Sequence, residues 1–269
     1  MREEMVSVEE HAARAQSYLE MLCSVKPNRR TGSPGNWEAT SFFADVVSGH
    51  GYEIDATPFE CLDHVSGGAE LRCGEAVFEV FVSPYSLGGD VEAELVSAST
   101  VEDLKGTDCE GKLLLMRGEI CSEQLMPRNF VFYNPEHHQG LIALVEHARP
   151  AAIITATERN PEQVGALYPF PLMVDGDFDI PNVHCTDVVG VAVEALEGEA
   201  FQLRIDARRV ASKATNVIAR LTRMRSRRLS SQPTSMRTRA PRALRTTHPA
   251  SSSCWLAPRC YPTSKGVTA

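Results

Sequence analysis

Acidic residues stop abruptly along this chain, and that break limits how much of it can fold. All 35 Asp and Glu residues lie at or before Asp206, whereas ten of the 27 Lys and Arg residues follow Arg220. Up to Arg220 the chain therefore has 17 basic against 35 acidic residues, a net charge of −18, and the rest carries +10. Residues 222–269 also lack apolar periodicity. A globular part of about 221 residues remains, enough for one large domain or two modest ones.

The charge and apolar patterns exclude several classes of partner. A strongly acidic body argues against nucleic acid, because phosphate binding requires a basic surface. No apolar run reaches the length that spans a membrane. The N-terminal stretch MREEMVSVEEHAARAQ is charged and has no signal-peptide core, so we expect a cytoplasmic protein. The eight scattered cysteines are then expected to be reduced and structural, not to form a disulfide framework.

The first 64 residues are expected to fold as helix, loop, helix and strand. Ser7 and Glu10 form the pattern of a capping box, after which apolar residues recur at helical spacing as far as Leu22. The loop KPNRRTGSPGN is rich in Pro, Gly and Asn, and Asn36 is placed to cap the second helix. The stretch YEIDATPFE, residues 52–60, then alternates as a strand does.

From about residue 65 the pattern changes to short strand-like runs with one clear helix. Such runs lie at 75–83, 91–99, 113–116, 151–155, 201–206 and 214–221. The segment NPEHHQGLIALVEHARP predicts a helix that leads into an apolar strand, as in a βα-type unit. The stretches SGGAE and SLGGD lack the strand-to-helix context of a phosphate loop, so we interpret them as turns.

Two segments together resemble a known family. RRTGSPGNWEATSFFADVVSGHGYEIDATPF is similar to the N-terminal signature of M28-family zinc aminopeptidases: a basic residue, T-G-S-P-G-N, a helix and then G-Y-x-[IV]. SKATNVIARL resembles the strand at which that family's catalytic domain resumes. The region between them, with DLKGTDCEGKLLLMRG and ARPAAIITAT, resembles the protease-associated (PA) domain that many of these enzymes carry as an insertion at this point.

The resemblance implies an α/β fold and a domain order. Residues 1–64 would form the first part of a mixed-sheet M28-like peptidase domain. Residues 65–206 would form an inserted β-rich, α+β PA-like domain able to fold alone, and 207–221 the strand that resumes the peptidase domain. The peptidase pieces would then expose core residues of the second helix, including Phe42, Phe43 and Val46, and would be prone to aggregate.

The resemblance also implies a chemistry that the chain cannot perform as it stands. In the family, two zinc ions about 3.5–4 Å apart activate a water that attacks the peptide carbonyl, and a Glu acts as general base. The first zinc ligands follow the NVIAR strand in an H-x-D motif and then a D-N-A-S-G motif. This sequence contains neither motif. We therefore expect no catalytic, metal-binding or cofactor-binding residue in the chain, and assign the two zinc ions and the peptide substrates to the intact family member.

A shifted reading frame of the gene permits the missing motifs within residues 222–269. Joining the third base of each codon to the first two of the next permits, from Ser230 through Leu256, the string V-V-T-A-H-I-D-A-x-x-G-T-P-G-A-A-D-N-A-S-G-V-V-V-L-L-A. This string combines a buried strand, an H-x-D and D-N-A-S-G turn and an apolar helix, in the order that the family requires. We infer a frame slip near Thr222 to Arg227, after which 222–269 is an aberrant, disordered basic tail. The competing hypothesis is a natural basic arm on a non-enzymatic PA-like interaction module.

Two residue pairs resemble chemical sites at first sight. His137 and His138 are adjacent on a helix, where neighbours point about 100° apart, so we expect a helix-start or solvent-facing role instead of a shared metal ion. His184 and Cys185 suggest a Cys/His nucleophile pair, but neighbours in sequence are rarely catalytic partners. A structural role in a strand and turn is predicted for this second pair.

Overall fold

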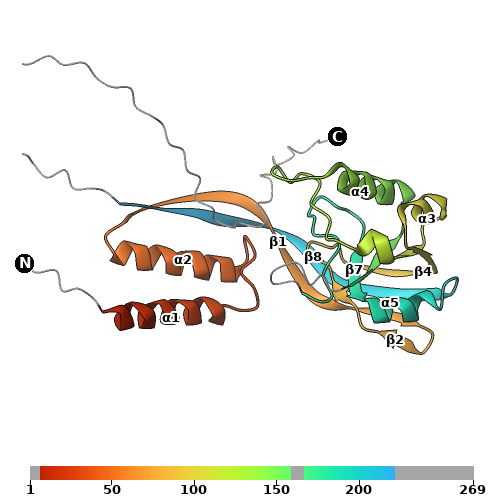
Figure 1. Ribbon diagram of the computed structural model, residues 1–269, viewed down its shortest axis with the longest axis horizontal. Helices are drawn as coiled ribbons and strands as arrows, with labels where there is room; N and C mark the ends of the chain where they lie inside the picture. The colour runs from red at the N-terminus through yellow and green to blue at the C-terminus, as the bar shows by residue number, and fades with distance from the viewer. Residues whose placement is uncertain (1–6, 159–166, 222–269) are drawn as a thin grey trace, which may run out of the picture. The chain divides into compact units, whose positions relative to one another are not determined.

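The chain divides into two compact units in the computed structural model, which describes residues 7–158 and 167–221 (Figure 1). The first unit comprises the described residues up to Phe59 and from Lys213, and the second runs from Glu60 to Ser212. The sequence placed an inserted domain at 65–206, and its assignment as PA-like stays a prediction. The frame slip and the disordered tail concern residues outside the described part of the chain.

Two helices open the first unit. Helix α1 (Val8–Ser24) begins with the predicted capping box, in which Ser7 Oγ accepts from the Glu10 amide and Glu10 accepts from the Ser7 amide. Helix α2 (Pro34–Gly49) is capped by Ser33, not by Asn36 as predicted. Pro34 supplies the helical φ of the first turn without needing an acceptor, so the Ser-Pro pair starts the helix before Asn36, whose amide donates to Ser33 Oγ.

The longest strands are β1 (Glu53–Cys73) and β8 (Ala200–Arg220), and both are longer than predicted. The strand expected at 52–60 continues through SGGAE, so interpreting that stretch as a turn was wrong. Gly67 lies against Asp206 of β8, where an added Cβ would come within 1.9 Å of the carboxylate, so this glycine permits the Asp206 side chain to approach β1 closely. The runs predicted separately at 201–206 and 214–221 are likewise one strand, because the polar residues between them continue the alternation.

The eight strands of the described residues form one mixed sheet in the order β2-β1-β8-β4-β5-β6-β7-β3. Strands β4 (Gly89–Ala98), β5 (Leu113–Met116), β6 (Ala152–Thr157) and β7 (Asn182–Thr186) run parallel, whereas β8 pairs antiparallel with β4. Short strands β2 (Ala76–Phe78) and β3 (Phe81–Val82) pair with β1 and β7. They divide the run predicted as one strand at 75–83.

Helices cover both faces of the parallel strands in the second unit (Figure 1). Helices α3 (Val101–Gly106) and α4 (Glu136–Ala148) pack on one face, against Leu114 and Met116, and α5 (Asp187–Glu194) packs on the other, against Leu113 and Leu115. Because alternate residues of β5 face opposite cores, the strand is apolar at every position. Helix α5 was not predicted, although Thr186 caps it by accepting from the Val189 amide.

Two further observations concern the cysteines and the helices of the described residues. Within the described residues, no disulfide joins Cys23, Cys73, Cys109, Cys121 or Cys185 to another cysteine. Among the described helices, none is both long and apolar enough to cross a membrane.

Candidate functional site

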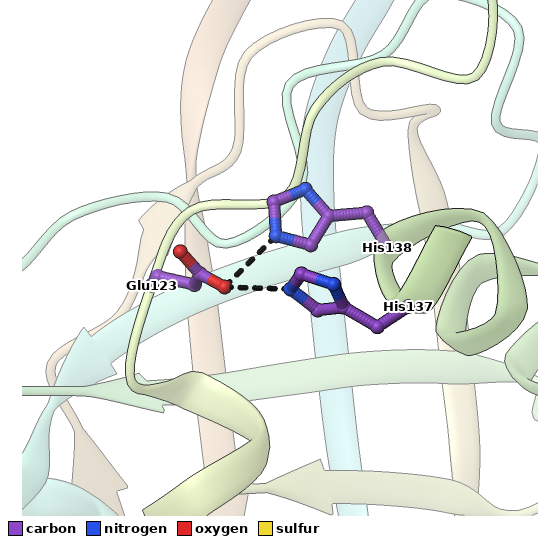
Figure 2. Close-up of side chains that lie close together, drawn as sticks. All are labelled: Glu123, His137 and His138. Atoms are coloured by element: carbon purple, nitrogen blue, oxygen red, sulfur yellow. Dashed lines mark hydrogen bonds and ion pairs between the residues drawn. The ribbon is translucent and has the colours of Figure 1, made fainter. Parts of the chain in front are cut away.

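Three side chains able to donate to a metal ion meet beside the start of α4: Glu123, His137 and His138 (Figure 2). The Nε2 atoms of His137 and His138 lie 2.9 and 3.0 Å from the same carboxylate oxygen, Oε1 of Glu123. All three donor atoms fall within 4.8 Å of one another. Within residues 7–158 and 167–221, no other group of three His, Cys, Asp or Glu side chains meets this condition.

The local sequence explains how these side chains are positioned. Glu123 follows the short 3₁₀ helix η1 (Gly118–Cys121), which is held by its buried residues Ile120 and Cys121. Helix α4 buries His138 together with Leu141, Ile142 and Val145. This spacing of three, four and seven residues is one helical face, so His138 belongs to the core side of the helix.

His137 and His138 reach the same carboxylate, although neighbours on a helix point about 100° apart. Their rings lie edge to face with centroids 4.4 Å apart, and both reach Glu123, which comes from a different segment. The predicted position at the helix start is confirmed for both residues. Solvent exposure holds for His137 alone, because the His138 side chain is only 1% exposed.

The hydrogen bonds of His138 define which ring nitrogen carries its proton. Its Nδ1 lies 3.1 Å from the amide of Met126, which can only donate. Nδ1 must therefore accept, and the proton of the neutral ring lies on Nε2, from which it is donated to Glu123. The buried imidazole thus bridges a backbone amide and a carboxylate.

Glu123 is the shared acceptor of the cluster. The hydrogen bond from His137, followed by that from His138, lowers the pKa of the Glu123 carboxyl below its usual range, against a smaller opposing effect of burial. The carboxylate is therefore ionised at neutral pH, as both a hydrogen-bond acceptor and a metal ligand require.

The cluster joins the two ends of a loop that exposes apolar side chains to solvent. Between Glu123 and His137 the chain exposes Val131, Phe132 and Tyr133 in succession, with Phe132 at 89%. The loop is held at its base by two bonds: the Arg128 amide donates to Asp175, and Asn134 Nδ2 donates to the Arg128 carbonyl at 2.7 Å. A fixed base and an apolar tip are typical of an interaction surface.

The second pair singled out by the sequence, His184 and Cys185, is buried in β7. The two side chains point to opposite faces of the strand, and Cys185 belongs to the core covered by α5. Burial lowers the pKa of His184 to about 4 and raises the pKa of the Cys185 thiol to about 12. At neutral pH the pair is an uncharged imidazole and an unreactive thiol, which agrees with the predicted structural role.

The donor set of the described residues does not fit the two zinc ions that the family resemblance implies. Two ions need more ligands than the three donors of the cluster, and these converge on a single position. We therefore derive no step of peptide hydrolysis through zinc in this chain.

No protein-family model and no curated protein matches this chain. Several solved structures match its fold. An aminopeptidase from Aneurinibacillus sp. strain AM-1 aligns with a TM-score of 0.52 and 21% identity over 76% of this chain and 47% of that one. A zinc aminopeptidase from Bacillus subtilis gives 0.52 and 16% over 77% of this chain and 46% of that one. A peptidase M28 precursor from Shewanella amazonensis SB2B gives 0.50 and 17% over 78% and 52%.

The chain shares the fold of M28-type zinc aminopeptidases. The predicted mixed α/β fold is thereby confirmed, and the family resemblance is supported at the level of the fold. The chain spans about half the length of the solved structures that it matches.

Proposed function

We propose that this chain is the amino-terminal part of a dinuclear zinc aminopeptidase, an enzyme that removes N-terminal residues from peptides. One observation carries the proposal. A sequence with the M28-like segment T-G-S-P-G-N has the fold of zinc aminopeptidases over about three quarters of its length. The intact enzyme would bind peptide substrates, with no nucleic-acid or membrane partner, in the cytoplasm.

The T-G-S-P-G-N segment has a clear structural task that supports this proposal. Ser33 caps α2, and Gly35 lies so close to the carbonyl oxygen of Asn28 that an added Cβ would approach it to 2.1 Å. The motif thus fixes the angle between the loop and the helix, a requirement that a chance match would not meet.

The second part of the proposal concerns the compact unit from Glu60 to Ser212. We assign residues 65–206 within it to a PA-like insertion, on the resemblance of its sequence. Its parallel strands and covering helices give it a core of its own, so it is able to fold without the rest of the chain.

In this proposal the chain as it stands is inactive, because a frame slip near Thr222 replaces the segment that carries the zinc ligands. The residues between Ser230 and Leu256 permit the H-I-D and D-N-A-S-G motifs in the shifted frame. A genuine basic arm has no reason to preserve codons that spell these motifs.

The test is to determine the nucleotides from codon 215 to codon 275 and to express both the present and the frame-corrected gene. We expect the shifted frame to spell both motifs. The corrected product should hydrolyse leucine p-nitroanilide with Zn²⁺, whereas the present chain should not. A shifted frame without either motif, or activity in the present chain, would contradict the proposal.

A second candidate function is a non-enzymatic module that binds a protein or peptide. The observation that favours it is the exposed run Val131, Phe132 and Tyr133 on an anchored loop. Under this alternative the tail is a real basic arm, so the nucleotide test above separates the two functions.

A further inference from the structure

The strongest unassigned chemistry in the described residues is the cluster of Glu123, His137 and His138 (Figure 2). We propose that these three side chains bind one divalent transition-metal ion, with Zn²⁺ as the best fit, and that binding rearranges the hydrogen bonds of the loop beside them. This inference does not depend on the proposed peptidase function, because it uses residues of the second unit alone.

Two of the three distances between donor atoms are close to those of a tetrahedral site, and the third is within 4.8 Å. Glu123 Oε1 lies 2.9 Å from the Nε2 of His137 and 3.0 Å from that of His138. In a tetrahedral Zn²⁺ site with bonds of about 2.0–2.1 Å, neighbouring donor atoms are about 3.3 Å apart. The carboxylate therefore needs to withdraw by only a few tenths of an ångström for an ion to take the place of the shared protons.

The donor types select the metal. Two imidazole nitrogens and one carboxylate oxygen suit Zn²⁺, Ni²⁺ or Co²⁺, whereas Ca²⁺ and Mg²⁺ require sets made of oxygen atoms. The described residues supply no fourth ligand, so water would complete the coordination. The half-exposed Glu123 and the exposed His137 give the ion a route from solvent, while the buried His138 fixes one vertex.

Metal binding requires a change of tautomer in His138. Without metal, Nε2 carries the proton and Nδ1 accepts from the Met126 amide. Coordination through Nε2 requires a free lone pair there, so that proton leaves to solvent and the neutral ring takes up one on Nδ1. An Nδ1–H group cannot accept from Met126, and the segment around Met126 must move. Breaking the hydrogen bond from Met126 should weaken metal binding roughly tenfold, compared with a site where binding breaks no hydrogen bond.

The test is to titrate the full chain with Zn²⁺ by calorimetry and with Co²⁺ by absorption, whose d–d bands report coordination geometry. We expect one site of micromolar affinity and tetrahedral Co²⁺ bands. His137→Ala and Glu123→Gln should weaken binding at least tenfold. Two exposed residues of the same helix provide matched controls, His147→Ala and Glu136→Gln, which should stay within twofold of the unchanged chain.

A second readout addresses the tautomer directly. Long-range ¹H–¹⁵N spectra of the imidazole rings should show His138 as the Nε2–H tautomer without metal and as the Nδ1–H tautomer at saturating Zn²⁺. The proposal is overturned if no binding occurs at millimolar metal. It is equally overturned if His137→Ala and Glu123→Gln bind as the controls do, or if His138 keeps its Nε2–H signal when saturated.

Discussion

The two units of this chain contain similar apolar patterns but differ sharply in how much of them is buried. In the second unit, the parallel strands are covered on both faces, and Leu113 to Met116 are fully inaccessible. In the first unit, α1 has no buried residue and α2 buries only Gly35. Apolar periodicity therefore shows which residues can be buried, and the described residues of the first unit do not supply the cover.

The aromatic residues of α2 illustrate the same difference. Phe42 is half-buried and packs edge to face on Tyr18, whereas Phe43 is exposed and Val46 is half-buried. The expected exposure of these three residues is thus found in part. We expect aggregation and proteolysis to begin in the first unit.

The largest predicted effect is the difference between truncating a buried leucine in the second unit and truncating an exposed leucine in the first. Leu115→Ala should lower the free energy of unfolding of the second unit by about 2–5 kcal/mol, because the side chain is fully buried in its core. Leu19→Ala, at a side chain that is 63% exposed, should change the free energy of unfolding of the first unit by about 0.5 kcal/mol or less. Urea titrations of both variants measure the contrast. Equal losses would show that the units are equally well packed.

Acid should destabilise the second unit through His184. Burial lowers its pKa to about 4 from the ordinary histidine value of 6.5, so the unfolded chain binds this proton first as the pH falls. The contribution of this group to stability is therefore complete above about pH 6.5 and declines towards pH 4, with about 2–3 kcal/mol lost at pH 4.5.

His184→Gln should remove that part of the pH dependence. Urea unfolding at pH 7 and pH 4.5 measures it, and His147→Gln, at an exposed position, serves as the control. An unchanged pH dependence in His184→Gln would show that the imidazole is not the responsible group.

Thiol reactivity provides a third contrast between the units. Cys23 on α1 is exposed, whereas burial raises the pKa of Cys185 to about 12. Since the thiolate is the reactive form, Cys23 should be alkylated at least roughly 100-fold faster than Cys185 at pH 8. Peptide mass spectrometry after timed alkylation resolves the two sites. Similar rates in the folded chain would place Cys185 at an accessible surface.

The smallest contrast concerns two arginine ion pairs. Arg220 pairs with Asp55 in the first unit, where both side chains are largely exposed, so Arg220→Ala should cost less than about 1 kcal/mol. Arg209 pairs with Asp179 in the second unit and donates to the Tyr85 carbonyl at 2.7 Å from a side chain that is only 13% exposed. Arg209→Ala should cost about 2 kcal/mol in thermal or urea unfolding. A reversed order would contradict the comparison.

Features defined by neighbouring residues were the most predictable from sequence. The capping box of Ser7 and Glu10 and the strand Leu113–Met116 were predicted from patterns only a few residues long. The length of β1 and β8 was missed, because glycines and charged residues tolerated in a long strand were taken as breaks.

The candidate site was only partly predictable for a related reason. His137 and His138 were noticed as a pair, but Glu123 lies 14 residues before His137, and no local pattern links them. Only the path of the loop brings the carboxylate to the rings. Glu123 could have been found by looking for Glu or Asp residues within about 15 residues of two adjacent histidines, which is the length of a long loop.

The joined ends of that loop make it a suitable place to insert foreign sequence. The side chains of Glu123 and His137, at the two ends of the loop, meet through a hydrogen bond of 2.9 Å, so residues around Phe132 can be replaced while this contact joins the ends. Doubling the length of a flexible loop costs only about 0.6 kcal/mol of closure entropy. A reporter peptide grafted at this tip would stand clear of both cores, which gives the unit a handle for labelling and capture.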